Sequence, residues 1–269
     1  MQLRDAHVVV TGASRGIGRE LAVVLLARGA RVSLVARSAT ALDEIAAASP
    51  PGLDGTFPCD LGDAGALDGL VDRIEDATGP VDVLVNNAGV DHTGPFETMT
   101  AAQLRTVVDV NLIATAELCR QAIPRMTARG RGLLVNVSSI GGSLASAGLV
   151  AYCATKAGVN QLTAGLRAEL KGTGVRTTLV EIGPVATGMM SDVRGYAPTA
   201  ASVRRLERAG LSPELDPRVV AEAMADAICS GRRHLRLPRR QAPVSMIAEA
   251  PRRIGEWLTV GLDTRPPAT

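Results

Sequence analysis

The sequence predicts an α/β fold: a single domain built on one doubly wound parallel sheet of about seven strands, with helices on both faces. Short apolar runs of strand length alternate with longer segments of helical periodicity along most of the 269 residues. A glycine-rich turn separates the first such run from the first helical segment. Hydrophobic residues make up 46% of the chain and aromatic residues 2%, so the core has to be aliphatic, as in buried parallel sheets.

Strand-like and helix-like segments follow one another in a regular order. The predicted strands are residues 8–10, 32–36, a run that ends at 59–61, 81–85, 132–137, 175–182 and 234–237. The predicted helices cover residues 17–28, 39–48, 67–77, 101–129, 152–170 and parts of 199–231. Because no repeat or linker interrupts this alternation, we expect one domain over 1–237 that includes a lid at 188–216. Residues 238–269 form a C-terminal extension.

The turn after the first predicted strand has the pattern of a dinucleotide-binding loop. Residues 11–18 read Thr-Gly-Ala-Ser-Arg-Gly-Ile-Gly and lead directly into a helical segment. Gly12 permits a tight turn, Gly16 lets the backbone approach a pyrophosphate, and Gly18 lets the helix pack close to the strand. Free N–H groups at the start of the helix would then bind phosphate. The loop residues expected to contact the cofactor are Gly12, Ser14, Arg15, Gly16, Ile17 and Gly18.

The end of the second predicted strand indicates which dinucleotide is preferred. Folds that bind NAD usually carry an Asp or Glu there, which binds the ribose 2′-hydroxyl. This chain has Ala36 followed by Arg37, and a guanidinium can bind a 2′-phosphate in a bidentate manner. Arg15 is a second candidate for that contact. We therefore predict NADP(H), with a solvated loop charge as the alternative role of Arg37.

The ends of the third and fourth predicted strands supply further contacts. Asp60, with Leu61 beside it, can accept a hydrogen bond from the adenine amino group. Its alternative role is to cap the helix that begins near Ala64. The fourth strand ends in Asn-Asn-Ala-Gly, whose small residues let a ribose and a nicotinamide lie against the backbone. The contacts expected there are Asn87, Ala88 and Gly89.

A tyrosine and a lysine stand four positions apart, at Tyr152 and Lys156, in a predicted helix. This spacing places both side chains on one face, one turn apart. An ammonium group near a phenol favours the phenolate, so we expect Lys156 to lower the pKa of Tyr152 and make it a general acid and base. Ser139 lies thirteen residues before Tyr152 and can return to the same substrate oxygen; Ser138 is the rival serine.

Together these residues resemble the short-chain dehydrogenase/reductase family over about residues 3–237. The family's glycine pattern matches residues 11–18, its Asn-Asn-Ala-Gly matches 86–89, and its Tyr-x-x-x-Lys matches Tyr152 and Lys156. One departure is Ile182, which stands where the family usually has Pro before Gly-x-Val-x-Thr. The matches to the family's catalytic Asn, Ser, Tyr and Lys are Asn111, Ser139, Tyr152 and Lys156.

The resemblance implies a role for each of these residues. Tyr152 would give a proton to a carbonyl oxygen, and Ser139 would hydrogen-bond the developing oxyanion. Lys156 would bind the nicotinamide ribose, and Asn111 would hold a water that links Lys156 to solvent. An Asn in an apolar helix can alternatively bind only backbone. Val185 and Thr187 would contact the nicotinamide.

Bulk composition excludes several classes of protein. A net charge of +2 gives no reason to expect a nucleic-acid partner. The cysteines show no metal-site spacing and are typical of reduced thiols, so we expect no metal and a cytoplasmic location. They are Cys59, Cys119, Cys153 and Cys229. We see neither a signal peptide nor an apolar run long enough to cross a membrane.

The lid and the extension are the segments whose roles the pattern leaves open. The lid offers apolar side chains that either pack on the core or face a lipophilic substrate. They are Met189, Met190, Val193, Tyr196, Val203 and Leu206. The extension combines arginines with an apolar helical face, interrupted by Pro251. We keep two alternatives for it: a lid or subunit contact, and peripheral attachment to an anionic membrane. We also expect a homo-oligomer, either a dimer or a tetramer.

The predicted function is NADP(H)-dependent hydride transfer between nicotinamide and a carbonyl or secondary alcohol. A lipophilic substrate of the steroid, retinoid or fatty-acyl type is expected, with a 3-oxoacyl thioester as the alternative. A non-catalytic dinucleotide sensor on the same fold is the alternative from another class. A sensor has no need for Asn111, Ser139, Tyr152 and Lys156 together, and their joint presence favours the enzyme.

Overall fold

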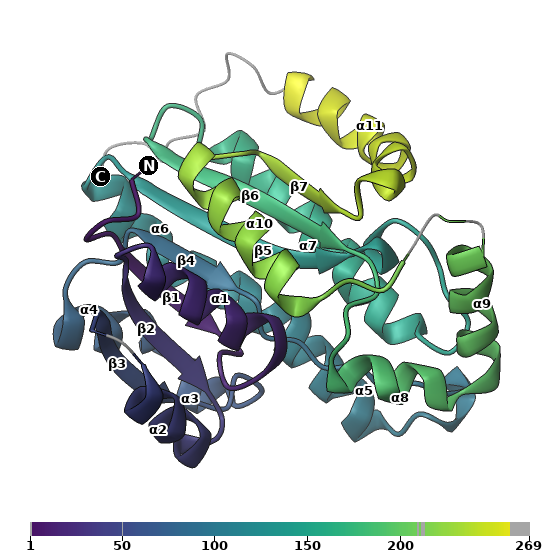
Figure 1. Cartoon of the computed structure of the whole chain (residues 1–269). Coiled ribbons are helices and arrows are strands. Elements are labelled where there is room, and N and C mark those ends of the chain that lie inside the picture. The colour runs from purple at the N-terminus through teal and green to yellow at the C-terminus, as the bar shows by residue number, and fades with distance from the viewer. Residues whose placement is uncertain (1, 50, 209, 211–212, 259–269) are drawn as a thin grey trace.

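In a computed structural model the chain forms one seven-stranded parallel sheet with helices on both faces (Figure 1). The structure describes residues 2–49, 51–208, 210 and 213–258, with the main chain alone for 244 and 252–258. The strand order is β3-β2-β1-β4-β5-β6-β7. This architecture confirms the predicted fold class.

The strands coincide closely with the apolar runs of the sequence. They are β1 (His7–Thr11), β2 (Arg31–Ala36), β3 (Leu53–Pro58), β4 (Val83–Asn86), β5 (Gly132–Ser139), β6 (Val175–Ile182) and β7 (His234–Leu237). The order reverses beside β1, because β2 lies on one side of it and β4 on the other. In an open sheet of this kind ligands bind outside the carboxyl ends of the strands at the point of reversal.

The helices lie between the strands in sequence. They are α1 (Gly16–Ala27), α2 (Ala39–Ala48), α3 (Ala64–Leu67), α4 (Leu70–Thr78), α5 (Ala101–Val108), α6 (Ala114–Ala128), α7 (Val150–Glu169), α8 (Gly188–Gly195), α9 (Ala197–Arg208), α10 (Pro217–Ser230) and α11 (Ala242–Leu258). Asp216 accepts a hydrogen bond at the start of α10, where Pro217 fits the first turn. In the part of the chain that is described, no helix is long and apolar enough to cross a membrane.

Alternation along each strand divides the core into two layers. Val8 and Val10 of β1 belong to a layer that includes residues of α1, α2 and α10, whereas Val9 belongs to a layer with residues of α4 and α6. Leu84 and Leu134 also belong to the second layer, whereas the residues directly before and after each of them belong to the first. The period of two along a strand explains this division, and burial on both faces explains why consecutive residues such as Val8, Val9 and Val10 are all apolar.

Two predicted helices are interrupted in the structure. The segment predicted at 67–77 is divided by Gly69, whose φ of 61° is left-handed, so α3 ends before α4 begins. The segment predicted at 101–129 contains a π-helical turn at Asp109–Ile113 between α5 and α6. Such turns are frequent at functional sites, and this one contains Asn111.

The last helix is attached to the sheet through buried charged side chains. Arg236 of β7 donates to Glu181 of β6 over 2.9 Å and also to Glu249 of α11. Glu181 in turn accepts from Ser143, over 3.0 Å, and from Asn160 of α7. Both carboxylates are almost fully buried, so each depends on these partners. The network connects α11 to the loop that follows Ser139.

Candidate active site

Two cavities meet at the carboxyl ends of the strands. The first, of about 450 Å³, is lined by the glycine loop and is named here the glycine-loop cavity. The second, of about 380 Å³, lies under α8 and α9 and is named the lid cavity. The residues that line both are Ile17, Tyr152, Ile182, Thr187 and Met189. Tyr152 therefore stands at the junction, as the one shared residue with an ionisable side chain.

The glycine loop is shaped by close backbone contacts. Gly12 has a φ of 65°, and a Cβ there would lie 2.8 Å from the Cα of Ala88. A Cβ on Gly18 would lie 2.3 Å from the carbonyl oxygen of Gly12. Arg15, at the N-cap position of α1, forms no side-chain cap, so the first N–H groups of this twelve-residue helix remain for another acceptor. This cradle beside an open cavity fits a pyrophosphate group.

Thr11 is a structural residue of the site that sequence reasoning used only as the edge of a motif. Its hydroxyl oxygen accepts from the main-chain N–H groups of Asn87, over 3.0 Å, and Ala88, over 3.1 Å. The same hydroxyl donates to the carbonyl oxygen of Val85. Thr11 therefore holds the end of β4 against the glycine loop. A hydroxyl residue at the end of a buried strand is the sequence signal that could have indicated this role.

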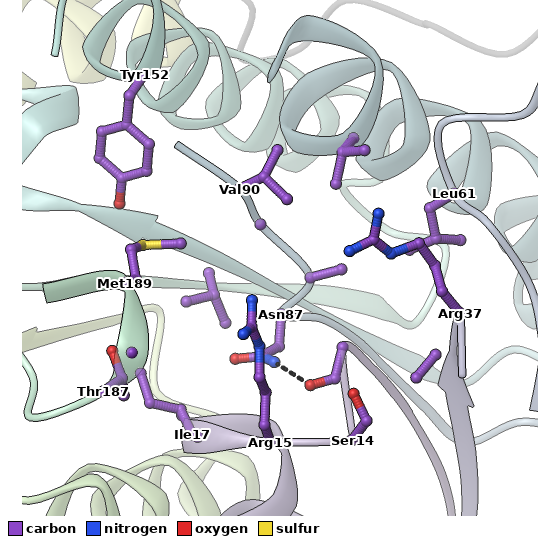
Figure 2. A pocket seen from close by; sticks show the side chains of 18 of the residues that line it. Ser14, Arg15, Ile17, Arg37, Leu61, Asn87, Val90, Tyr152, Thr187 and Met189 are labelled. Carbon is purple, nitrogen blue, oxygen red and sulfur yellow. Dashed lines mark hydrogen bonds between the residues drawn. The ribbon is translucent and has the colours of Figure 1, made fainter. Parts of the chain in front are cut away.

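Two arginines extend into the glycine-loop cavity, as Figure 2 shows, with Arg37 and Tyr152 at opposite ends of the view. Both Arg15 and Arg37 are exposed, and within the described ranges neither forms an ion pair. Ala36 lines the cavity without adding a carboxylate. This arrangement fits a ligand with an extra phosphate at that end.

Asp60 also lines this cavity, but it does not cap the following helix. Its Oδ1 accepts from the N–H of Gly62 over 3.0 Å. Asp63 supplies the cap of α3 instead, by accepting from Gly65 and Ala66. The alternative role considered for Asp60 is therefore wrong, and its second oxygen stays available to a ligand.

Most of the predicted cofactor residues line the glycine-loop cavity. They are Gly12, Ser14, Arg15, Gly16, Ile17, Arg37, Asp60, Leu61, Asn87, Ala88, Gly89, Tyr152, Lys156 and Thr187. Two others lie elsewhere. Gly18 packs beneath the loop, and Val185 lines the lid cavity, where it also pairs with Leu215. β6, the strand before Val185, ends at Ile182, the residue that departs from the family pattern. Ile182 pairs with both Ser139 and Leu237.

Tyr152 and Lys156 share one face of α7, as their spacing predicts. The Nζ of Lys156 lies 5.8 Å from the centre of the Tyr152 ring and donates to the carbonyl oxygen of Val137 over 2.9 Å. Lys156 is almost fully buried, and burial lowers its pKa to about 8. A lysine in this state retains its proton near neutral pH and can still donate to a ligand hydroxyl.

The pKa of Tyr152 differs from the prediction that Lys156 would lower it. Burial raises the pKa of Tyr152 to about 12, and the nearby charge of Asp91 acts in the same direction. A hydrogen bond with the Ser139 side chain opposes this rise without overcoming it. In the protein alone the loss of water around the phenol dominates and Lys156 is not among the groups that shift this pKa, so Tyr152 is protonated across the neutral range.

Ser139, rather than Ser138, lies beside Tyr152. Ser139 lines the lid cavity, and its oxygen accepts from the N–H of Gly141 over 3.1 Å. Ser138 points to the other face of β5 and donates to the carbonyl oxygen of Lys156. The preference for Ser139 as the serine of the site is consistent with this geometry.

Asn111 has its side chain fully engaged. Its Oδ1 accepts from the N–H of Val90, and its Nδ2 donates to the carbonyl oxygen of Val90, both over 2.8 Å. Nδ2 also approaches the hydroxyl of Thr155 at 3.1 Å. A Cβ added at Gly89 would lie 3.5 Å from Oδ1 of Asn111 and 3.5 Å from Nζ of Lys156. The side chain thus positions backbone, and a bridging water stays a prediction.

The lid cavity is lined mainly by apolar side chains. Five of the six lid residues singled out in the sequence face it: Met189, Met190, Val193, Val203 and Leu206. The sixth, Tyr196, packs instead against Gly148, where a Cβ would lie 2.6 Å from the ring. Sequence reasoning missed Asp91 and Cys153, which line the same cavity beside Tyr152. Their neighbours in sequence, the Asn-Asn-Ala-Gly turn and Tyr152, are the signal that could have found them.

Comparison with known proteins agrees with this site. The family described as short chain dehydrogenase matches residues 6–196. The ketoacyl reductase HetN of Nostoc sp. (strain PCC 7120) is 38% identical over 229 residues, 84% of this chain and 76% of the relative. A short-chain dehydrogenase from Streptomyces avermitilis has a TM-score of 0.77 and 33% identity, covering 95% of this chain and 97% of its own.

A second solved structure, a metagenomic short-chain oxidoreductase in complex with NADP, has a TM-score of 0.70 and 32% identity. The alignment covers 88% of this chain and 97% of that one. The family match spans every residue that lines the glycine-loop cavity and those of the lid cavity up to Val193, but not the α9 residues of the lid cavity. The chain belongs to the short-chain dehydrogenase/reductase family of oxidoreductases.

Proposed function

We propose that this protein is an NADP(H)-dependent oxidoreductase that reduces lipophilic carbonyl compounds or oxidises the corresponding secondary alcohols. The observation that carries the proposal is the position of Tyr152, which lines both the glycine-loop cavity and the apolar lid cavity. Arg15 and Arg37 support the choice of NADP(H), because they place positive charge where no carboxylate competes. The related oxidoreductase solved with NADP supports it as well.

The cofactor supplies the hydride, and the residues of the chain supply orientation and the proton. Tyr152 is protonated in the protein alone, so it can give its proton to a carbonyl oxygen during reduction. Ser139, at the adjacent edge of the lid cavity, donates to the oxygen that becomes negative. Lys156 donates to ribose hydroxyls, while Asn111 fixes the backbone at Val90.

The lid cavity supports a lipophilic substrate. Its methionine, valine and leucine side chains offer apolar contact, and its volume of about 380 Å³ suits a small organic molecule. A 3-oxoacyl thioester is a second candidate, supported by the relative that is named a ketoacyl reductase. A long acyl chain would occupy the same apolar space, so the two candidates differ chiefly in the thioester.

A panel of carbonyl compounds tests the proposal. Purified protein is mixed with NADPH and, separately, with alkyl ketones, steroid ketones, retinal and a 3-oxoacyl thioester, and the nicotinamide absorbance is followed. We expect turnover of at least one lipophilic carbonyl. If Tyr152→Phe abolishes this turnover, the reaction takes place at the site that contains Tyr152. Absence of NADPH oxidation with every class would overturn the proposal.

Cofactor preference provides a separate test. A charge-assisted contact contributes about 1.5–3 kcal/mol, or roughly 10- to 150-fold in affinity. We therefore expect NADPH to be preferred over NADH by at least about tenfold in kcat/KM, and less so at high salt. Ala36→Asp combined with Arg37→Gln should reverse that preference through repulsion of the 2′-phosphate. Equal use of NADH and NADPH by the unmodified protein would mean that Arg37 is only a solvated loop charge.

A further inference from the structure

One carboxylate, that of Asp91, lines the mainly apolar lid cavity. Asp91 follows Val90, the residue whose backbone Asn111 holds, and it lines the cavity together with Tyr152 and Ser139. It is partly buried. The only other charged side chain in the lining is Arg205 of α9, which is exposed. Asp91 is therefore the acidic group placed next to the reacting centre.

The contacts that Asp91 makes leave acceptor capacity free. Thr93 donates its hydroxyl to Oδ2 over 3.1 Å, and the main-chain N–H of Asp91 itself also interacts with the carboxylate. An ionised carboxylate has about four acceptor sites. Among the residues that the structure describes, no arginine, lysine or histidine forms an ion pair with Asp91.

Burial is the largest influence on the charge of Asp91, and it outweighs the hydrogen bond from Thr93 and the nearby His92, which both lower its pKa. Burial raises the pKa of Asp91, and the nearby charge of Asp192 adds to this rise. The charge of Asp91 also contributes to the raised pKa of Tyr152, so the carboxylate lies within electrostatic reach of the phenol. A positive or hydrogen-bonding group of a ligand placed between them would relieve both effects.

We infer that Asp91 recognises a hydrogen-bond donor, a hydroxyl or an ammonium group, carried by the substrate close to its reacting carbonyl. The inference rests on the proposed function and narrows its substrate class to ketones with an apolar body and a donor beside the carbonyl. Because like charges repel in a cavity of low polarity, a carboxylate at that position of the substrate would be rejected. Asp91 is thus a specificity-determining residue rather than a source of the transferred proton.

Four matched ketones test this inference. They are an alkan-2-one and its 1-hydroxy, 1-methoxy and 1-dimethylamino derivatives. The ether has nearly the shape of the alcohol without the donor, and the protonated amine carries an N–H. For the unmodified protein we expect kcat/KM for the hydroxy ketone to exceed that for the ether by about tenfold, equivalent to about 1.4 kcal/mol.

Variants separate recognition from packing. Asp91→Ala should abolish the preference for the hydroxy ketone over the ether while leaving the plain ketone active. Asp91→Asn retains a carbonyl acceptor, so the hydroxyl preference should persist while the preference for the protonated amine is lost. Asp43→Asn removes an exposed carboxylate of α2 that lines neither cavity, and it is the control that should change neither ratio.

The outcomes of this experiment are distinct. Equal kcat/KM for alcohol and ether in the unmodified protein, or an unchanged ratio in Asp91→Ala, would overturn the role of Asp91 while the proposed oxidoreductase function stands. If the unmodified protein reduces none of the four ketones or any other carbonyl, both proposals fall. Should Asp91→Ala not fold, the contrast between alcohol and amine in Asp91→Asn decides.

Discussion

The two cavities that meet at Tyr152 are built from different parts of the chain. The glycine-loop cavity is formed mainly by strand ends and tight turns, where backbone approaches backbone and Gly12 and Gly18 leave no room for a side chain. The lid cavity is formed by side chains from α8, α9 and the loop after β5. The first is set by the sheet, and the second depends on segments added at its edge.

This difference separates what the fold determines from what individual side chains determine. A cavity made of backbone can bind the part of a ligand that is common to many reactions, whereas one made of lid side chains can change its substrate by substitution. Tyr152 and Met189 belong to both, so chemistry takes place where the fixed and the variable parts meet. Substitutions can therefore act on one cavity, on the other, or on the junction.

Tyr152→Phe acts on the junction and should have the largest effect. Phe keeps the ring and removes the transferable proton, so we expect kcat to fall by roughly 10²- to 10⁴-fold. NADPH affinity, measured by fluorescence titration, should stay close to that of the unmodified protein, because the glycine-loop cavity is retained. Near-normal turnover in a folded variant would show that another group supplies the proton.

Lys156→Met tests the buried ammonium of the glycine-loop cavity. Burial lowers the pKa of Lys156 to about 8 from the ordinary 10.5. Between pH 8 and pH 10.5 Lys156 is protonated in the unfolded state and largely neutral in the folded state. The free energy of unfolding therefore rises with pH over this range, by about 3 kcal/mol in total. Below pH 8 Lys156 is charged in both states, and the folded state carries the full free-energy cost of burying that charge.

The measurement is urea unfolding of the unmodified protein and both lysine variants between about pH 7 and pH 10.5. The rise with pH should be absent in Lys156→Met and retained in Lys171→Met, which changes the only other lysine, an exposed one. Lys156→Met should also bind NADPH more weakly. Parallel pH curves for Lys156→Met and the unmodified protein would contradict the assigned pKa.

Gly18→Ala tests whether backbone contact shapes the glycine-loop cavity. Its Cβ would lie 2.3 Å from the oxygen of Gly12 and 2.6 Å from Nδ2 of Asn87. We expect a loss of about 1–3 kcal/mol in the free energy of unfolding, together with weaker NADPH binding. Gly165→Ala is the control in α7, because its added Cβ meets nothing within 4 Å. Equal stability of the two variants would show that the loop tolerates a side chain.

Leu206→Ala acts only on the lid cavity and should have the smallest effect. Loss of part of the apolar contact should raise KM for a long-chain ketone by roughly fivefold, about 1 kcal/mol, with little change for a short ketone. NADPH affinity should not change. Met246→Ala, at a 52% exposed position on α11, is the control. A matching change in NADPH affinity would mean that the two cavities are not independent.

The parts of this protein that follow local rules were predictable from sequence. The glycine loop and the Tyr152–Lys156 spacing each depend on a few consecutive residues, and every predicted strand is present. The alternation of strands with helices predicts a parallel sheet, but it does not fix the strand order, because doubly wound sheets of different order share it. The π-helical turn at Asp109–Ile113 was not predictable, because it depends on the bonds of Asn111 to Val90, which is twenty-one positions away in sequence.

Features that depend on burial and long-range contact were also missed. The pKa of Tyr152 is set mainly by loss of solvent, which the spacing to Lys156 does not reveal. The roles of Thr11 and Asp91 depend on which strand ends and loops lie side by side. The side chains of Ile254, Trp257 and Leu258 lie outside the described part of the chain, so the role of the extension stays a prediction.

The charged network around Arg236 implies that the terminal helix and the loop after β5 cannot be altered independently of each other. Glu249 shares this arginine with Glu181, which also holds Ser143 just beyond Ser139. Replacing Glu249 alone would leave Arg236, whose side chain is 11% exposed, with one carboxylate partner fewer. A substitution of Glu249 is therefore expected to require a matching change at Arg236, so the terminal helix and the loop that contains Ser143 form one unit for redesign.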